Sequence, residues 1–175
     1  FVYFEGRGGN DLFDQFTALD EGDEADEDNR AFVLGGQGDD LLTSSIGQDT
    51  IDGGEGDDFI DGKDGNDQLT GGSGNDIVYG GGNSSNSADI DTYVLSGGKD
   101  NYRLSRADNT TFDYVYYIQD IRNESPDGLN TLYDIDKLQF SNDLQINLTE
   151  YYAEKVTDGS SSDTISGSDL DDLID

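Results

Sequence analysis

Apolar residues recur every nine positions through the middle of the chain, and this period constrains the fold more than any other feature of the sequence. The apolar positions are Val33, Leu42, Ile51, Ile60, Leu69 and Val78. An aspartate stands two positions before five of them, and a glycine stands two positions before each aspartate. The aspartates are Asp40, Asp49, Asp58, Asp67 and Asp76. The unit reads G-G-x-G-x-D-x-U-x, where U is apolar, and such a short internal period predicts a solenoid of stacked repeats.

Each unit divides into a glycine-rich turn and a strand of three residues. The glycines can adopt positive φ angles or let another backbone approach closely, and the x-U-x half is a strand with one side chain facing inward. Two units make one coil of about 18 residues, so alternate turns stack on the same edge. Residues 35–40, 53–58 and 71–76 would line one edge, and residues 44–49 and 62–67 the other. We therefore predict an all-β fold built as a parallel β-roll.

The charge of the chain limits its partners. Nine Lys and Arg residues face forty Asp and Glu residues, which gives a formal net charge of −31. Nucleic acid needs basic partners for its phosphates, so nucleic-acid binding is not expected. A compact chain this acidic repels itself unless something neutralises the charge, and metal cations are the natural partners.

Missing residue types limit the chemistry further. The chain has no Cys and no His, which excludes a Ser-His-Asp set, a thiol nucleophile and a His-bound metal, so we do not expect an enzyme. No apolar run reaches the roughly 18 residues of a membrane span, so no membrane insertion is expected. The chain starts at Phe1 without an initiator Met, and we interpret it as an internal piece of a longer protein.

The repeat brings oxygen ligands together at each edge. Stacking puts Asp40 near the turn at 53–58, Asp49 near the turn at 62–67, and Asp58 near the turn at 71–76. Each gap then holds one or two carboxylates and several carbonyls bared by glycine. Such hard oxygen ligands suit Ca²⁺, which takes six to eight of them at about 2.3–2.6 Å. The column of U residues is a thin core, so we expect several Ca²⁺ ions to be needed for folding.

The repeat pattern weakens toward both ends of the chain. We expect a degenerate repeat-like start over residues 1–34, with a solvated acidic loop at 20–28, and the β-roll itself over 35–91. Residues 92–150 are richer in tyrosine and basic residues and read as a small β-rich cap, with strands near 102–104, 114–118, 138–140 and 144–148. Residues 151–175 read as a linker and the start of a second array.

The nonapeptide resembles the RTX (repeats-in-toxin) family. Three later segments add to the resemblance: Asp91-Thr92-Tyr93-Val94-Leu95, Asp127-Gly128-Leu129-Asn130-Thr131-Leu132 and Asp136-Lys137-Leu138-Gln139-Phe140-Ser141. The resemblance implies a right-handed parallel β-roll with Ca²⁺ between its turns. It also implies export by a type I secretion apparatus, with folding outside the calcium-poor cytosol.

The resemblance further implies which residues bind Ca²⁺. In the family, one turn offers repeat positions two, four and six, and the next turn on that edge offers positions one, three and five, mostly through backbone carbonyls. The first set is Gly36, Gly38 and Asp40 with Gly53, Glu55 and Asp57. The second is Ser45, Gly47 and Asp49 with Gly62, Asp64 and Asn66. The third is Gly54, Gly56 and Asp58 with Gly71, Ser73 and Asn75, and a fourth pairs Asp67 with the Gly80 turn.

Three functions of different classes fit these features. The first is a calcium-dependent structural or adhesive segment of a large secreted or bacterial cell-surface protein, such as an adhesin or an S-layer protein. The second is the secretion and folding module of a toxin or a secreted enzyme whose active domain lies elsewhere. The third is a polysaccharide-binding module. The internal position, two arrays separated by a cap and the lack of catalytic residues motivate the first, and the third ranks last. The sequence does not separate the first two.

Overall fold

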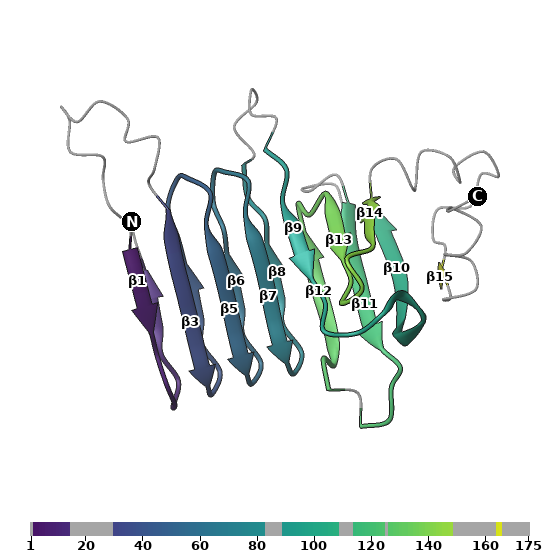
Figure 1. Ribbon diagram of the computed structural model, residues 1–175, viewed down its shortest axis with the longest axis horizontal. Coiled ribbons are helices and arrows are strands. Elements are labelled where there is room, and N and C mark those ends of the chain that lie inside the picture. Colours follow the sequence, from purple (N-terminus) through teal and green to yellow (C-terminus); the bar gives the residue numbers. More distant parts are fainter. Residues whose placement is uncertain are drawn as a thin grey trace.

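The computed structural model describes residues 2–14, 30–82, 89–108, 114–124, 126–148 and 164–165, and two β-sheets face each other along it (Figure 1). Sheet A contains, in spatial order, β1 (Val2–Glu5), β3 (Ala31–Gln37), β5 (Thr50–Glu55), β7 (Gln68–Ser73), β9 (Thr92–Val94), β13 (Lys137–Gln139) and β14 (Gln145–Asn147). Sheet B contains β15 (Thr164–Ile165), β10 (Tyr102–Asp108), β11 (Tyr114–Asp120), β12 (Leu129–Tyr133), β8 (Ile77–Tyr79), β6 (Phe59–Asp61), β4 (Leu41–Thr43) and β2 (Leu12–Asp14). A single 3₁₀ turn (Lys99–Asn101) precedes β10.

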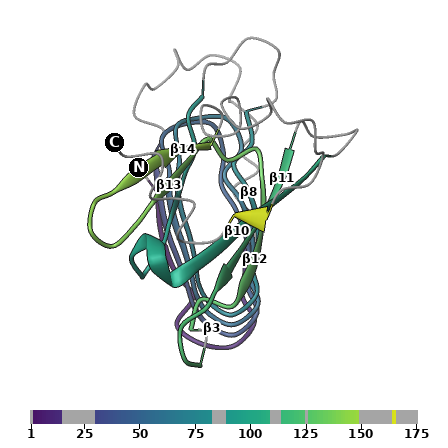
Figure 2. The same cartoon turned by 90° about the vertical axis from the view of Figure 1, so that its right-hand side faces the viewer.

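The strands of the array pair in parallel with the expected period. Ile51 of β5 pairs with Leu69 of β7, and Leu42 of β4 pairs with Ile60 of β6. Hydrogen bonds between neighbouring turns likewise join residues 18 positions apart. The predicted coil of two nonapeptides is therefore confirmed, and Figure 2 shows successive coils superposed when the roll is viewed from its end.

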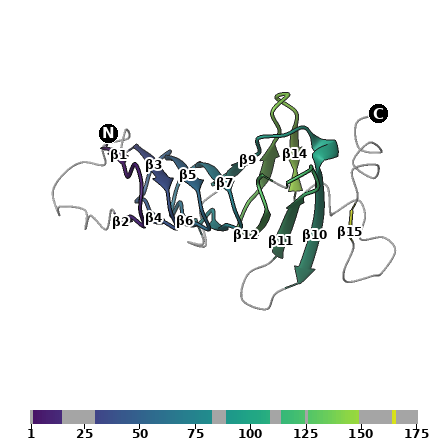
Figure 3. The same ribbon diagram turned by 90° about the horizontal axis from the view of Figure 1, so that it is seen from below.

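The core is the predicted column of U residues. Val33, Leu42, Ile51, Ile60, Leu69 and Val78 are all 0% exposed. Strands β4, β6 and β8 are three residues long, and only the central side chain of each is buried. Figure 3 shows the strands of the two sheets along opposite sides of the roll. Because sheets A and B contribute alternate members of the column, each half-coil adds one apolar side chain to the core between them.

The roll extends on the N-terminal side of the array. Phe4 of β1 pairs with Val33, and Phe13 of β2 pairs with Leu42, so residues 2–14 form one more coil. The rings of Phe4 and Phe13 lie 4.7 Å apart and close the core at this end. The predicted acidic loop at 20–28 lies outside the described residues.

The parallel ladders also continue on the C-terminal side. Leu132 of β12 pairs in parallel with Val78, and Leu138 of β13 pairs in parallel with Tyr93. Strands β10, β11 and β14 add to the two sheets in antiparallel orientation. The strands predicted near 102–104, 114–118, 138–140 and 144–148 are confirmed as β10, β11, β13 and β14.

The all-β fold class and the parallel β-roll are both confirmed. Of residues 151–175, the structure describes only β15, which pairs in antiparallel orientation with β10. The described part of the chain contains no helix long and apolar enough to cross a membrane.

Candidate functional site

The repeat aspartates form a ladder along each edge of the roll. Asp40, Asp49, Asp58, Asp67 and Asp76 are between 1% and 3% exposed. One oxygen of each accepts a hydrogen bond from the backbone N–H one coil earlier. Asp40 N donates to Asp58 Oδ1 at 2.8 Å, and Asp58 N donates to Asp76 Oδ1 at 3.0 Å. On the other edge, Asp49 N donates to Asp67 Oδ1 at 2.8 Å.

The second oxygen of each aspartate is left without a partner. Within the described residues, no hydrogen-bond donor reaches the buried Oδ2 atoms of Asp11, Asp40, Asp49, Asp58, Asp67 and Asp76. An unpaired buried polar group costs about 1–3 kcal/mol, and a charged one costs more. Six such atoms at one repeat position indicate that a ligand, and in particular a cation, completes the turns.

A carbonyl oxygen from the next turn converges on the carboxylates of Asp11, Asp40, Asp58 and Asp67, whereas the Tyr93 hydroxyl lies beside that of Asp76. A Cβ atom added at Gly62 would lie 2.5 Å from Asp67 Oδ2 and 2.7 Å from the Gly80 carbonyl oxygen. A Cβ at Gly53 would likewise collide with Asp58 Oδ2 and with the Gly71 carbonyl. The first glycine of the repeat therefore leaves open a space that a carboxylate and a carbonyl both face.

The carbonyls at repeat positions two and four face the next turn. The Gly36 carbonyl points at Gly54, and the Gly38 carbonyl points at Gly56. Gly56 has a φ of 131°, which only glycine adopts without strain, and a Cβ there would collide with Gly38. The same contacts recur one coil later, because the carbonyls of Gly54 and Gly56 point at Gly72 and Gly74, and on the other edge Gly47 points at Gly65.

The predicted ligands at positions three and five take part in other hydrogen bonds. The carbonyls at position three accept hydrogen bonds from position four of the preceding coil, as when Gly38 N donates to Glu55 at 2.7 Å. Asp64 and Ser73 accept in the same way from Gly47 and Gly56, at 2.8 Å each. The side chains at position five, Asp57, Asn66 and Asn75, are exposed. Asn75 N donates to Asp57 Oδ1 at 2.7 Å, so position five forms a separate surface ladder.

The gap at Asp49 differs from the others. Ser44 stands at the first position of this copy, where the neighbouring copies have glycine, and it is 2% exposed. Its hydroxyl donates a hydrogen bond of 2.6 Å to the Gly62 carbonyl, which is a predicted ligand of the second set. The adjacent Ser45, at position two, is partly buried. The Gly62 carbonyl therefore already accepts a hydrogen bond. In the neighbouring copies the first position is a glycine, which has no hydroxyl to donate.

This donor set fits calcium. No group of three or more His, Cys, Asp or Glu residues gathers anywhere in the described ranges. The cause is geometric, because stacking places one repeat aspartate on each edge for each coil, so the remaining donors must be carbonyls. Hard oxygens in a flexible turn suit Ca²⁺ better than Mg²⁺, which demands a tight octahedron.

Burial raises the pKa of the ladder carboxyls. Desolvation is the largest cause, and it raises the pKa of Asp58 to about 6, of Asp76 to about 7 and of Asp67 to about 9. Neighbouring carboxylates along the same edge raise these values further, whereas backbone hydrogen bonds lower them. The ionised turns are therefore unfavourable at neutral pH unless a cation lies beside them.

Two aspartates outside the predicted sets occupy the same position. Asp11 has an unpaired Oδ2 that faces the open space at Gly6 together with the Gly35 carbonyl. Asp91 is 1% exposed, and its Oδ2 faces Gly80 together with the Asp134 carbonyl. Both stand two positions before an apolar residue, which is the signal that could have identified them. Asp11 stands 29 positions before its ladder partner Asp40, and Asp91 stands 24 positions after Asp67, instead of 18, so both fall outside the nine-residue phase.

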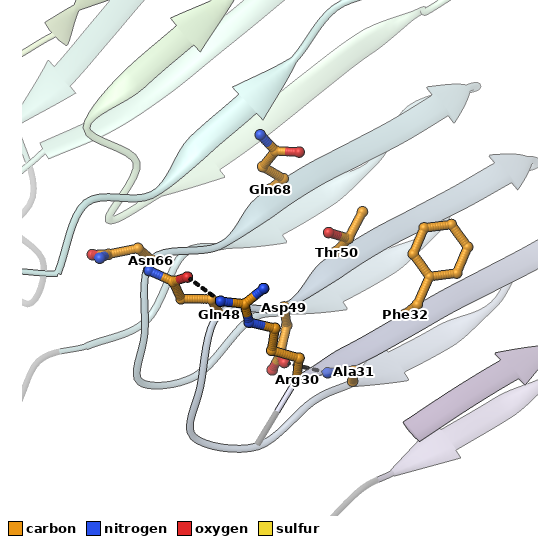
Figure 4. A pocket seen from close by; sticks show the side chains of 8 residues that line it. All are labelled: Arg30, Ala31, Phe32, Gln48, Asp49, Thr50, Asn66 and Gln68. Carbon is orange, nitrogen blue, oxygen red and sulfur yellow. Dashed lines mark hydrogen bonds between the residues drawn. The ribbon is translucent and has the colours of Figure 1, made fainter. Parts of the chain in front are cut away.

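A polar groove of about 360 Å³ lies on the outer face of sheet A (Figure 4). One row of its lining follows the paired residues Phe32, Thr50 and Gln68 across three strands. The rest of the lining consists of Arg30, Ala31, Gln48, Asp49 and Asn66. Arg30 Nη2 donates to Gln48 Oε1 at 3.3 Å, so the groove combines a guanidinium, amides, a hydroxyl and an aromatic ring.

A family model described as the RTX calcium-binding nonapeptide repeat (4 copies) matches residues 34–69 and 52–84. No curated protein and no solved structure matches the chain. The matched residues contain the aspartate ladder and most of the U column, and the resemblance predicted from the sequence is confirmed. Repeats of this type are structural, bind calcium and are generally not catalytic. Proteins that contain them are typically secreted by type I systems.

Proposed function

Because residues 34–84 are an array of RTX calcium-binding nonapeptide repeats, which makes the chain a member of the RTX family, we propose that it folds when Ca²⁺ binds in the gaps between its stacked turns. The unpaired, buried Oδ2 atoms carry this proposal. A buried carboxylate oxygen that has lost its water and found no donor is destabilising, and a divalent cation compensates it directly.

We propose one Ca²⁺ for each unpaired carboxylate. The sets centred on Asp40, Asp49 and Asp58 are those predicted above, and Asp67 forms a fourth with Gly62 and the Gly80 carbonyl. Asp76, whose Oδ2 is also unpaired, would hold a further ion at the last turn of the array. Asp11 adds a site with the Gly35 carbonyl on the N-terminal coil.

The role of the segment follows from where it folds. We propose that it is exported by a type I system in the unfolded state, because the unpaired carboxylates disfavour the roll in a calcium-poor cytosol. Outside the cell, it would serve as a rigid structural or adhesive part of a large extracellular or cell-surface protein. A secretion and folding module attached to a toxin or an enzyme is the alternative, and a parent protein with a catalytic domain would favour it.

A calcium titration tests the proposal. The chelator-treated protein is titrated with CaCl₂ while far-ultraviolet circular dichroism is recorded, and MgCl₂ serves as the control. A cooperative gain of β signal with Ca²⁺ alone is expected. A β-rich spectrum that neither chelator nor Ca²⁺ changes, in a sample that elemental analysis finds free of calcium, would contradict it.

The groove on sheet A favours polysaccharide contact as a second function. Amides and a hydroxyl can both donate to and accept from sugar hydroxyls, and Phe32 offers a ring stacked at 5.9 Å on Tyr3. Retention on a panel of neutral and carboxylated polysaccharide gels tests this. Arg30→Gln should abolish retention, whereas Arg7→Gln, an identical charge change on the opposite edge, should preserve it. Equal retention of both variants would contradict a role for the groove.

A further inference from the structure

The aspartate ladder on the edge of residues 35–76 ends in an asparagine. Asp76 N donates to Asn130 Oδ1 at 2.7 Å, just as Asp40 N donates to Asp58 and Asp58 N donates to Asp76. Asn130 lies at the start of β12, 54 positions after Asp76, and is 1% exposed. It therefore occupies the next rung of the same ladder, one coil beyond the last repeat.

The second side-chain atom of Asn130 is fully paired, unlike that of the aspartates. Its Nδ2 donates to the Tyr93 hydroxyl at 2.8 Å and to the Asp127 carbonyl at 2.9 Å. An amide nitrogen has two hydrogens to donate, and both are used. On every preceding rung of this edge, from Asp11 to Asp76, the corresponding atom is a buried Oδ2 without a donor among the described residues.

Tyr93 is positioned to accept this hydrogen bond from Asn130. It occupies an inward position of the core column, where the array has Val, Leu or Ile, and it is 1% exposed. Its hydroxyl oxygen accepts the N–H from Asn130 Nδ2, and this contact needs no counter-ion. The same hydroxyl lies beside Asp76 Oδ2, because a Cβ atom added at Gly71 would collide with both.

The opposite edge ends differently. Asp91 N donates to Asp136 Oδ2 at 2.9 Å, so the last rung there is still a carboxylate. The amide at position 130 is thus a property of one edge and not a general feature of the end of the roll.

We propose that Asn130 is the residue that ends the calcium requirement on this edge, because its amide supplies N–H groups to a rung whose carboxylate counterparts need a cation. This inference rests on the proposed calcium function and adds where the row of bound ions ends on this edge. The coil of β12 then joins the roll without an ion of its own beyond Asp76. Replacing the amide with a carboxylate should extend the row of bound ions by one.

Ion counting on three variants tests the inference. Bound calcium per chain is measured by elemental analysis after equilibrium dialysis, and the midpoint of thermal unfolding is measured with chelator and with calcium. Asn130→Asp should bind one more ion than the wild type and lose stability in chelator. Asn10→Asp is the matched control, because its Oδ1 also accepts a backbone N–H, from Asp39 at 3.1 Å, but it is exposed and belongs to no ligand set. Asp76→Asn moves the amide one coil inward and should bind one ion fewer.

The outcomes separate this inference from the function on which it rests. A wild-type chain that binds no calcium refutes the proposed function. A wild type that binds calcium, together with an Asn130→Asp variant that has the same ion count and the same chelator stability as Asn10→Asp, overturns the role of Asn130 alone. If Asn130→Asp fails to fold, Asp76→Asn decides, and an unchanged ion count in that variant overturns the inference.

Discussion

The replacement Asp58→Asn should stabilise the roll without calcium and destabilise it with calcium. Asp58 lies in the middle of its stack and is 2% exposed. The asparagine Oδ1 can still accept the 2.8 Å hydrogen bond from Asp40 N, and its new N–H₂ group faces the Gly71 carbonyl. The substitution therefore keeps the ladder and removes only the charge.

The size of the effect follows from the pKa of Asp58. Burial raises this pKa from an ordinary value of 3.8 to about 6, and each pKa unit corresponds to about 1.4 kcal/mol. The ionised carboxylate thus destabilises the calcium-free roll by at most about 3 kcal/mol at neutral pH. Since the folded-state pKa is raised, the stability linked to this group is complete below about pH 4 and is lost as pH rises through about 6. The gain from Asp58→Asn should therefore be present at neutral pH and absent near pH 4.

Denaturant unfolding with chelator and with excess calcium measures both halves of this prediction. In calcium the order should reverse, because the variant has lost an anionic ligand and binding to the folded state adds less stability. Asp39→Asn is the control, since it removes the same charge from an exposed rung, outside the ligand sets, whose Oδ1 accepts a backbone N–H from Asp57 at 3.0 Å. If Asp58→Asn lowers stability equally under both conditions, or if the two variants behave alike, the cation argument fails.

Three further predictions concern the same roll. The chelated protein should gain β signal on acidification from about pH 9 to about pH 4, because the pKa of Asp67 is raised to about 9 and its protonation removes a buried charge; circular dichroism against pH checks this. Ile60→Ala should cost about 2–5 kcal/mol in calcium, measured by denaturant unfolding, since this side chain is 0% exposed. Gly56→Ala should prevent calcium-induced folding, because the φ of this residue is 131° and its new Cβ would collide with the Gly38 carbonyl. Gly98→Ala should fold normally, because its φ is −76° and its Cβ would lie 3.8 Å from Asn101 Oδ1.

The array could be predicted from the sequence because its signals are local and repeated. The U residues, the turn glycines and the aspartates each serve one purpose in every coil, so nine-residue spacing alone predicts burial, coil length and edge. The position of Asp58 Oδ2 opposite the Gly71 carbonyl follows from that register.

The two ends of the roll could not be predicted in the same way. Phe13 stacks on Leu42 across an insertion, and Leu132 stacks on Val78 across 54 residues, and no period marks such partners. These strands are placed by what their side chains bury. Asn130 illustrates the limit, because an asparagine next to a turn is common, and only the ladder contact with Asp76 gives it a meaning.

In the antiparallel strands beyond the roll, an arginine side chain compensates the charge of the buried acidic residues. Asp120 and Asp127 are 2% and 7% exposed, and Arg122 Nη2 lies 2.7 Å from Asp120 Oδ2 and 3.0 Å from Asp127 Oδ1. Burial raises the pKa of Asp120, but the hydrogen bonds from Arg122 and from Asp127 N outweigh it and the pKa is lowered. The Arg122 guanidinium, which also lies 5.5 Å from the Tyr102 ring centre, therefore pairs with both acidic side chains. A chain that uses arginine at one end and leaves the carboxylates of its repeats unpaired concentrates its need for a cation in the repeats, which agrees with the proposed calcium-dependent folding.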